Sequence, residues 1–356
     1  MASAARVDVI KQLQRETITI QGLRSAFARW PFGVNKHLDQ VRADVECTLR
    51  TRFKDHPKLQ KLVQGDYGLF GATSWPCANY MELLIATYLS LWLFMWDDAL
   101  DSDVGELAHD FDAGQLYRAE TLGFVKTHLG LDDPQVVSTS SNGVIQSFDQ
   151  IGAALRSSCS VDQRRTFLKE FRLFMDKSEI EQSLRLRTGL VNLDEYSRYR
   201  RGTSAVRVVL AINQYCHGID LPPDVTKDPD YTTLWHLTNV NIYSVNDLLS
   251  VKKELAQGSA GSLVPILYAE LGSAQKAADQ VMRIVTLTIA EFDQAAERLV
   301  TRHGGKSAEL ARELETFIVG CRYYCTGNLT WSLSTGRYGV HQELEDDRLT
   351  IALGGA

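Results

Sequence analysis

The stretch LLIATYLSLWLFMWDDALD, residues 83–101, decides the fold class of this chain. Residues 83–96 are apolar almost throughout, and two aspartates follow them directly. This apolar run is too short to span a bilayer, which takes about 20 apolar residues. A helix that is apolar on every side belongs in the core of a larger protein. We therefore predict a buried helix over residues 79–98 that leads into an acidic cluster.

Helical spacing of apolar residues dominates the rest of the chain, and no run of alternating β-branched residues stands out. Further helices are expected at residues 41–53, 114–128, 141–156, 161–185, 193–203, 205–217, 233–258, 262–271, 273–303 and 307–334. There is no internal repeat, low-complexity tract or long linker. We therefore predict one all-α domain over residues 1–356. Residues 1–35 are less periodic and are expected to wrap around the outside.

Composition excludes several classes of protein. The 356 residues are 44% hydrophobic, carry a net charge of -6 and contain no Lys/Arg-rich run, which argues against a nucleic-acid partner. The six cysteines form no CxxC pair, and a chain of this size needs no disulfide framework. The first residues, MASAARVDVIKQLQRETI, lack the apolar segment of a secretory signal. We expect a cytoplasmic protein without a stable membrane anchor.

The acidic cluster at the end of the apolar helix is the first candidate metal site. Asp97 and Asp101 are four residues apart, so their carboxylates share one helix face, and Asp98 lies between them. Acids at a helix C-terminus oppose the helix dipole and repel one another, and a divalent cation would compensate both effects. The alternative is a solvated acidic helix end. Two other acidic pairs, at residues 132–133 and 346–347, follow no apolar helix and have no third acid one turn on.

A second polar cluster lies in the stretch NVNIYSVNDLLSVKKE, residues 239–254. Asn246, Ser250 and Glu254 are spaced four residues apart and therefore share one helix face. An amide, a hydroxyl and a carboxylate supply three oxygen ligands of the kind that magnesium takes. The alternative is an exposed polar face. Asn and Ser are poor choices within a helix unless their side chains are used, which favours the metal site.

Together the two clusters carry a resemblance to a known family. DDALD matches the aspartate-rich pattern DDxxD, and NDLLSVKKE matches the pattern NDxxSxxKE. The stretch GRYGV, residues 336–340, adds an Arg-Tyr pair. In this order and spacing the chain resembles the class I terpene synthases of fungi and bacteria over residues 70–340. The resemblance implies an all-α bundle of helices around one deep active-site cavity.

The resemblance also implies a set of metal ions. It places three Mg²⁺ ions in the cavity. Two are held on the aspartate-rich side, mainly by Asp97, and one is held by Asn246, Ser250 and Glu254. The expected ligand is an isoprenyl diphosphate, and a second copy of the chain, as a homodimer, is the one protein partner that we consider.

The resemblance further implies residues that bind the diphosphate. Arg200 stands 46 positions before the motif asparagine, where the family has a diphosphate-sensing arginine, although the assignment could slip by one to Arg201. The family breaks this helix just after the sensor, and Thr203 and Ser204 are expected at the break. The remaining diphosphate-binding residues are Lys253, Arg337 and Tyr338. Out of this context, each cation would be an ordinary surface residue.

Aromatic side chains are the expected lining of the cavity, because their faces stabilise cations without reacting with them. The candidates are Phe70, Trp75, Phe94 and Trp331. For each of them ordinary core packing is the alternative. Trp92 and Trp96 are expected to pack outward between helices instead.

The expected activity is that of a lyase of fungal secondary metabolism, which cyclises the fifteen-carbon farnesyl diphosphate. Geranyl diphosphate and a twenty-carbon substrate are the alternatives. An isoprenyl transferase would carry a second aspartate-rich motif in place of NDLLSVKKE, and a non-catalytic binding protein would not need the complete ligand set. The product could be a hydrocarbon or an alcohol. Asn142, Asn213 and Asn241 would each hold a water if they faced the cavity.

Overall fold

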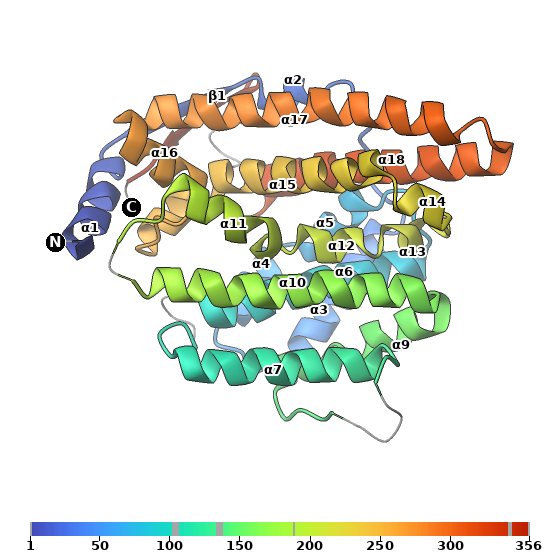
Figure 1. The fold of residues 1–356 in the computed structure, drawn as a ribbon. Coiled ribbons are helices and arrows are strands. Elements are labelled where there is room, and N and C mark those ends of the chain that lie inside the picture. The colour runs from blue at the N-terminus through green and yellow to red at the C-terminus, as the bar shows by residue number, and fades with distance from the viewer. Residues whose placement is uncertain (1, 102–106, 133–137, 188, 341–343, 355–356) are drawn as a thin grey trace.

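A computed structural model of the chain shows a bundle of helices with a small sheet along one side (Figure 1). It describes residues 2–101, 107–132, 138–187, 189–340 and 344–354, with only the backbone at residues 2–5, 101 and 344–345. The elements are α1 (Ala2–Leu13), β1 (Thr17–Gln21), α2 (Leu23–Ala26), α3 (Leu38–Arg52), α4 (Leu59–Gln64), α5 (Tyr67–Ser74), α6 (Tyr80–Asp101), α7 (Phe111–His128), α8 (Gly143–Gln146), α9 (Asp149–Ser158), α10 (Val161–Arg185), α11 (Leu193–Thr203), α12 (Val206–Leu210), α13 (Asn213–His217), α14 (Pro223–Thr226), α15 (Pro229–Ala256), α16 (Leu263–Leu271), α17 (Ala274–His303), α18 (Ala308–Ser334), β2 (Leu344–Glu345) and β3 (Arg348–Ala352). The all-α fold class predicted from the sequence is confirmed.

Helix α6 is the buried helix that the apolar stretch predicts. Within the described residues it is the one helix long and apolar enough to cross a membrane, and most of it is buried inside the bundle. Trp92 packs against Phe171 of α10, with ring centroids 5.6 Å apart. Trp96 stacks on Tyr117 of α7 at 5.3 Å. Both tryptophans therefore pack between helices, as predicted, and Phe94 and the aspartates that follow occupy the other side of α6.

Local capping explains where α10 begins, whereas two of the expected helices are divided. Helix α10 has the predicted bounds because Ser160 and Gln163 form a capping box at its start. The helix expected over residues 141–156 is divided into α8 and α9. Similarly, the helix expected over residues 205–217 is divided into α12 and α13. Periodicity of apolar residues continues across such short interruptions, so it did not reveal them.

A three-stranded sheet joins the two ends of the chain, and the sequence analysis did not predict it. β1 pairs antiparallel with β3, from Thr17 opposite Ala352 to Gln21 opposite Arg348, and β2 pairs with the other edge of β3. The strands are short and alternate buried with exposed residues, which is the usual strand pattern. The sheet is too small to change the fold class.

The N-terminal segment lies on the outside of the bundle, along α16 and α17 (Figure 1). Arg6 of α1 donates hydrogen bonds to the backbone oxygens of Arg185 and Gly258, each at 3.2 Å. This contact ties α1 to the end of α10 and to the loop after α15. One continuous core of buried side chains reaches from Ile10 to Leu353, and the single domain stays a prediction.

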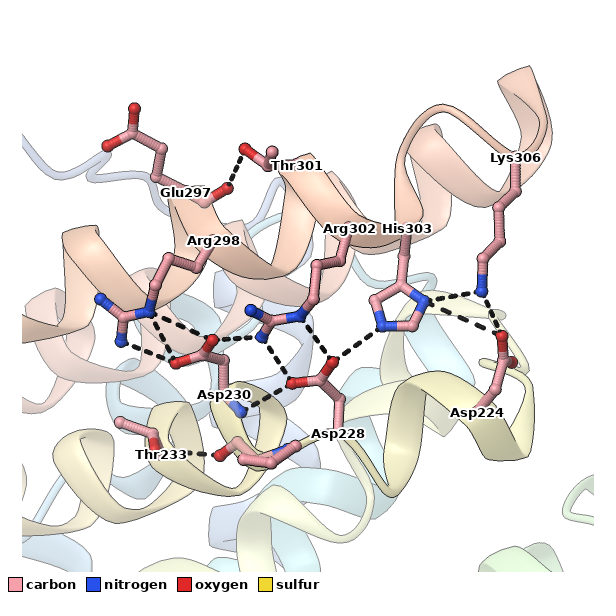
Figure 2. A network of polar contacts seen from close by, with 11 residues as sticks. Asp224, Asp228, Asp230, Thr233, Glu297, Arg298, Thr301, Arg302, His303 and Lys306 are labelled. Atoms are coloured by element: carbon pink, nitrogen blue, oxygen red, sulfur yellow. Dashed lines mark hydrogen bonds and ion pairs between the residues drawn. The ribbon is translucent and has the colours of Figure 1, made fainter.

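The start of α15 meets the end of α17 in a network of ion pairs (Figure 2). Asp228 caps α15 by accepting from the backbone N–H of Asp230, and Pro229 occupies the first helical position. Arg302 donates to Asp228 at 2.9 and 2.7 Å, and His303 contacts the same carboxylate at 2.9 Å. Acids at a helix start and cations at a helix end both match the helix dipoles. The segment after Asp228 is therefore the first turn of a helix, which begins at Pro229 and not at the predicted residue 233.

Replacing Asp228 by alanine is expected to lower the free energy of unfolding at pH 7 by at least ~1 kcal/mol, because the cap is lost along with the charge. Hydrogen bonds from Arg302 and His303 lower the pKa of Asp228. Its contribution is therefore present above the pKa of an unfolded aspartate, about 4, and is lost as the pH falls below that value. Urea titrations at pH 7 and pH 3 measure both effects.

The matched control is Asp224→Ala, since Asp224 is more than half exposed and pairs with Lys306 at the surface. This variant should change stability by less than ~1 kcal/mol. Equal losses in the two variants at pH 7 would contradict the role given to Asp228.

Candidate active site

A cavity of about 520 Å³ opens between α6, α10, α11, α15 and α18. It lies inside the ~300–1,000 Å³ range of pockets that bury small ligands. Polar, charged, apolar and aromatic side chains all line it, and the Arg337 guanidinium lies over the Phe94 ring at 5.1 Å. The cavity residues that carry the argument are Phe70, Phe94, Asp97, Asp98, Arg200, Thr203, Ser204, Asn246, Ser250, Lys253, Glu254, Tyr324, Asn328, Arg337 and Tyr338.

The end of α6 brings two aspartates to the cavity. Asp97 and Asp98 both line it, one position apart on the last turns of the helix. Asp98 accepts two hydrogen bonds from Arg337, at 3.0 and 3.3 Å. Burial acts to raise the pKa of Asp98, but the Arg337 guanidinium outweighs burial and lowers it. The backbone of Asp101 belongs to α6, and its side chain lies outside the described residues.

The second predicted cluster lies on one face of α15, and all three side chains line the same cavity. The Ser250 hydroxyl donates to Glu254 Oε1 at 2.6 Å, and the Asn246 amide donates to the Tyr338 hydroxyl at 2.7 Å. Glu254 Oε2 is buried and has no hydrogen-bond partner among the described residues. Burial, followed by the nearby Asp247 carboxylate, raises the pKa of Glu254. A cation at this position would therefore offset the cost of keeping Glu254 ionised.

Three predicted cations reach the cavity from three different elements. Arg200 on α11, Lys253 on α15 and Arg337 after α18 all line it, whereas Arg201 is exposed. Of the two candidate arginines, Arg200 is therefore the one that reaches the cavity. Burial, followed by the nearby Arg337, lowers the pKa of Lys253 to about 8.

Asp247 holds Arg200 in place, and sequence reasoning had given it no role. The Asp247 side chain is fully buried and accepts from Arg200 Nη2 at 2.6 Å. It also accepts from the Tyr196 hydroxyl at 2.5 Å and from the backbone N–H of Leu263 at 2.9 Å. A buried charge needs such partners. The signal in the sequence was an acid next to Asn246 in an otherwise apolar stretch of helix.

The predicted break after Arg200 is present. Helix α11 ends at Thr203, Ser204 caps it, and Ala205 adopts a positive φ of 56°, which is unusual for alanine. The Ser204 hydroxyl donates to Asn239 Oδ1 at 2.6 Å, so α15 supports the break. Thr203 and Ser204 both line the cavity, and the Thr203 hydroxyl is buried without a partner among the described residues.

The aromatic predictions are met only in part. Phe70 and Phe94 line the cavity, together with Tyr324, which the sequence analysis did not select. Trp331 and Trp75 are completely covered and do not reach the cavity surface. Trp331 donates from its indole N–H to the backbone oxygen at position 65, at 2.7 Å, which turns it toward α4 and α5. Trp75 stacks behind Tyr324 at 6.0 Å, so the prediction that both tryptophans face the substrate was wrong.

The three asparagines considered as water ligands do not line the cavity. Asn142 caps α8 at the surface. Asn213 bonds the backbone of Phe317, and Asn241 donates to Thr288 at 3.2 Å. A fourth asparagine, Asn328 on α18, lines the cavity instead.

The donor set across the cavity fits hard divalent cations. Carboxylate oxygens of α6 and amide, hydroxyl and carboxylate oxygens of α15 line the same cavity, and such oxygens are the ligands that magnesium takes. In the part of the chain that the structure describes, no three His, Cys, Asp or Glu residues cluster as a metal site. The candidate metal ligands therefore include Asn246 and Ser250 as well as carboxylates. The unpartnered buried oxygen of Glu254 is consistent with a ligand that binds here.

In this all-α bundle, α6 and α15 thus bring oxygen donors to one cavity that three cations also line. The chain belongs to the terpene synthase family. The family model "Terpene synthase family 2, C-terminal metal binding" matches residues 88–291. The sesquiterpene cyclase hepA of Aspergillus oryzae is 33% identical over 342 residues, which cover 94% of this chain and 92% of that protein.

More distant relatives share the same architecture. The silphinene synthase peniA of Penicillium patulum is 23% identical over 93% of this chain and 88% of its own length. The crystal structure of an α-eudesmol synthase has a TM-score of 0.75 and 17% identity, over 86% of this chain and 98% of that one. A hedycaryol synthase in complex with HEPES has a TM-score of 0.71 and 19% identity, over 85% and 95% of the two chains. These two structures show that the fold is shared.

Proposed function

We propose that this protein is a Mg²⁺-dependent cyclase that ionises farnesyl diphosphate and closes the carbocation into a sesquiterpene, with release of diphosphate. One observation carries the proposal. The acids of α6, the oxygen donors of α15 and three cations line one cavity together with apolar and aromatic side chains. This arrangement suits a substrate with a charged head and a long hydrocarbon tail.

The residues that would hold the metal ions are Asp97 on one side, with Asp98 and Asp101 beside it, and Asn246, Ser250 and Glu254 on the other. Three Mg²⁺ ions, when bound, neutralise charge on the departing diphosphate. The Ser250 hydroxyl donates to Glu254 Oε1, and both the Ser250 oxygen lone pairs and Glu254 Oε2 would stay available to a cation.

Arg200, Lys253, Arg337 and Tyr338 would bind the phosphate oxygens. Arginine gives a fixed fork of donors that matches phosphate, and the tyrosine adds one hydroxyl donor. In the present structure Arg337 bonds Asp98 and Tyr338 accepts from Asn246. Substrate binding would therefore exchange both contacts for contacts with phosphate, which couples the filling of the site to its closure.

Thr203 and Ser204 would lie beside the reacting end of the substrate. The helix break exposes polar groups next to the Arg200 guanidinium. Such dipoles can stabilise charge as it develops when the carbon–oxygen bond breaks. Below them, Phe70 and Phe94 offer aromatic faces that stabilise a cation by about 0.5–2 kcal/mol each and keep water out.

The same fold and chemistry also suit an isoprenyl transferase, but the second cluster here pairs an amide and a hydroxyl with one carboxylate instead of repeating an aspartate-rich motif. The name of the hepA relative favours a fifteen-carbon substrate over a ten- or twenty-carbon one. The cytoplasmic location and the homodimer stay predictions.

Farnesyl diphosphate is expected to give a kcat/KM at least ~10-fold above those of geranyl and geranylgeranyl diphosphate, because each mismatched isoprene unit loses contacts or does not fit. Steady-state diphosphate release with each substrate at saturating Mg²⁺ measures this ratio. A clear preference for geranyl diphosphate would replace the sesquiterpene proposal with the monoterpene alternative.

A further inference from the structure

The hydrocarbon part of the cavity contains a few polar side chains. The Ser90 hydroxyl already donates to the backbone oxygen of Ala86 at 2.9 Å. Thr203 belongs to the helix break beside Arg200. Asn328, on α18, lines the same cavity, but neither a hydrogen bond nor a helix break accounts for a polar side chain at this position.

The Asn328 side chain is only 5% exposed, and no hydrogen bond joins it to any residue that the structure describes. A buried amide without a partner costs folding free energy, because it has lost the water that would otherwise solvate it. Such groups are rare in native proteins, and each one calls for an unseen ligand or a function. The Asn328 amide faces a cavity that binds a reactive substrate, so a functional reason is the more direct one.

Tyr324 lies one turn before Asn328 on the same face of α18, and it lines the cavity too. Its ring is fixed by stacking on Trp75 at 6.0 Å and by an edge contact with Phe70 at 6.2 Å. Its hydroxyl has no hydrogen-bond partner among the described residues. Burial raises the pKa of Tyr324, so the phenol stays protonated and can donate.

Ser332, one turn after Asn328, provides an internal comparison. Its hydroxyl is also buried and without a partner in the described part of the chain. It does not line the cavity, however. Asn328 and Tyr324 therefore differ from Ser332 in facing the space where the substrate would bind.

We propose that Asn328 and Tyr324 hold one water molecule against the cavity wall, and that this water adds to the final carbocation so that the product is a cyclic alcohol. The proposal rests on the cyclase function proposed above. A buried water needs two or more polar partners, and these two side chains supply the unpartnered amide N–H of Asn328 and the phenol hydroxyl of Tyr324. Asn328 Nδ2 donates to the water oxygen and the phenol oxygen accepts one O–H of the water, which leaves one lone pair of the water free.

The chemistry balances with water as the only added reactant. The free lone pair forms a C–O bond to the cationic carbon, and the resulting oxonium loses a proton to the diphosphate anion released in the first step. No oxidant or reductant is needed. Because the water is held at one place on α18, it reaches only a cation that forms beside that helix. Cations that form earlier and elsewhere in the cavity are therefore not quenched.

Incubation with farnesyl diphosphate and Mg²⁺ in water enriched in oxygen-18 tests the proposal. The wild-type protein should give a cyclic alcohol that carries one labelled oxygen. Asn328→Leu keeps a similar side-chain volume without the amide, and it should lower the alcohol fraction of the terpene products by at least ~10-fold. Total diphosphate release should fall by less than about threefold, because ionisation takes place elsewhere in the cavity.

Tyr324→Phe is the second variant and should also shift the products toward hydrocarbons. Ser332→Ala is the matched control on the same helix and should leave the alcohol fraction unchanged. Thermal unfolding serves as the folding check. Asn328→Leu should melt at or above the wild-type temperature, since it removes an unpartnered polar group.

Two results would overturn the water site. One is a wild-type product mixture of hydrocarbons alone, with normal diphosphate release. The other is an unchanged labelled-alcohol fraction in both Asn328→Leu and Tyr324→Phe, which would show that the water is held elsewhere. Failure of the cyclase proposal itself looks different, because no cyclic fifteen-carbon product, hydrocarbon or alcohol, would then form.

Discussion

Alanine at Asp97 or at Glu254 is expected to lower kcat by at least ~10³-fold while the protein stays folded. Each variant removes a carboxylate that faces the cavity, so the charge of the departing diphosphate is no longer neutralised. Neither change should weaken the core. The buried Glu254 carboxylate has a raised pKa and one unpartnered oxygen, so its loss should leave stability unchanged or improved. Product formation at saturating Mg²⁺ and urea unfolding measure the two effects.

Glu82→Ala is the matched control for these variants. Glu82 lies on the first turn of α6, the helix that carries Asp97, and does not line the cavity. Its removal should leave kcat within about twofold, the usual result away from the chemistry. Turnover near the wild-type rate in Asp97→Ala or Glu254→Ala would show that these residues are not the metal ligands. Asp98→Ala should be milder, since Asp98 is bonded to Arg337.

Substituting Arg337 by lysine is expected to lower kcat/KM by ~10²-fold even though the charge is kept. The two hydrogen bonds from Arg337 to the Asp98 carboxylate show that the guanidinium reaches the cavity in a forked geometry. A planar diphosphate-binding fork cannot be reproduced by the single ammonium group of lysine. The expected loss therefore measures the geometry of the contact rather than its charge.

Tyr338→Phe is the natural comparison, because it removes one hydroxyl from the same segment. Its effect should be smaller, with more linear or water-quenched product from a site that closes less completely. Arg337→Lys with a kcat/KM within about threefold of wild type would contradict the role of the fork. So would a structure with Mg²⁺ and diphosphate in which Arg337 is farther from the phosphates than one bridging water.

The sequence predicted most of the candidate site because its motifs are periodic on helices. A four-residue spacing relates Asp97 to Asp101, and the same spacing relates Asn246, Ser250 and Glu254. Residues with this spacing share one face of an α-helix. No long-range information was needed beyond the assumption that the two faces meet. In the structure, residues of α6 and α15 line the same cavity.

The aromatic lining could not be predicted in the same way. Whether an aromatic residue on α18 faces the cavity depends on how that helix is rotated against α5 and α15, and a single sequence does not define that rotation. Trp331 was selected for its proximity to Arg337, but it points toward α4 and α5, and Tyr324 and Asn328 face the cavity instead. The role of Asp247 was not predicted for a related reason. Asp247 acts by binding Arg200, which is distant in the sequence.

The small sheet and the start of α15 were missed for two different reasons. The strands β1 and β3 come from opposite ends of the chain, so neither shows a hairpin pattern along the sequence. The start of α15 at Pro229 was missed because the apolar periodicity begins only after its first turn. Cap and proline signals at Asp228 and Pro229 would have located it.

The measurement that tests the central claim most directly is the reaction of the purified protein with farnesyl diphosphate, with Mg²⁺ or with a chelator, followed by mass analysis of the extracted products. We predict that Mg²⁺ gives diphosphate and cyclic fifteen-carbon products in equal amounts, and that the chelator abolishes both. Diphosphate release that does not depend on Mg²⁺, or transfer of the farnesyl group to a second isoprenyl diphosphate in place of cyclisation, would contradict it.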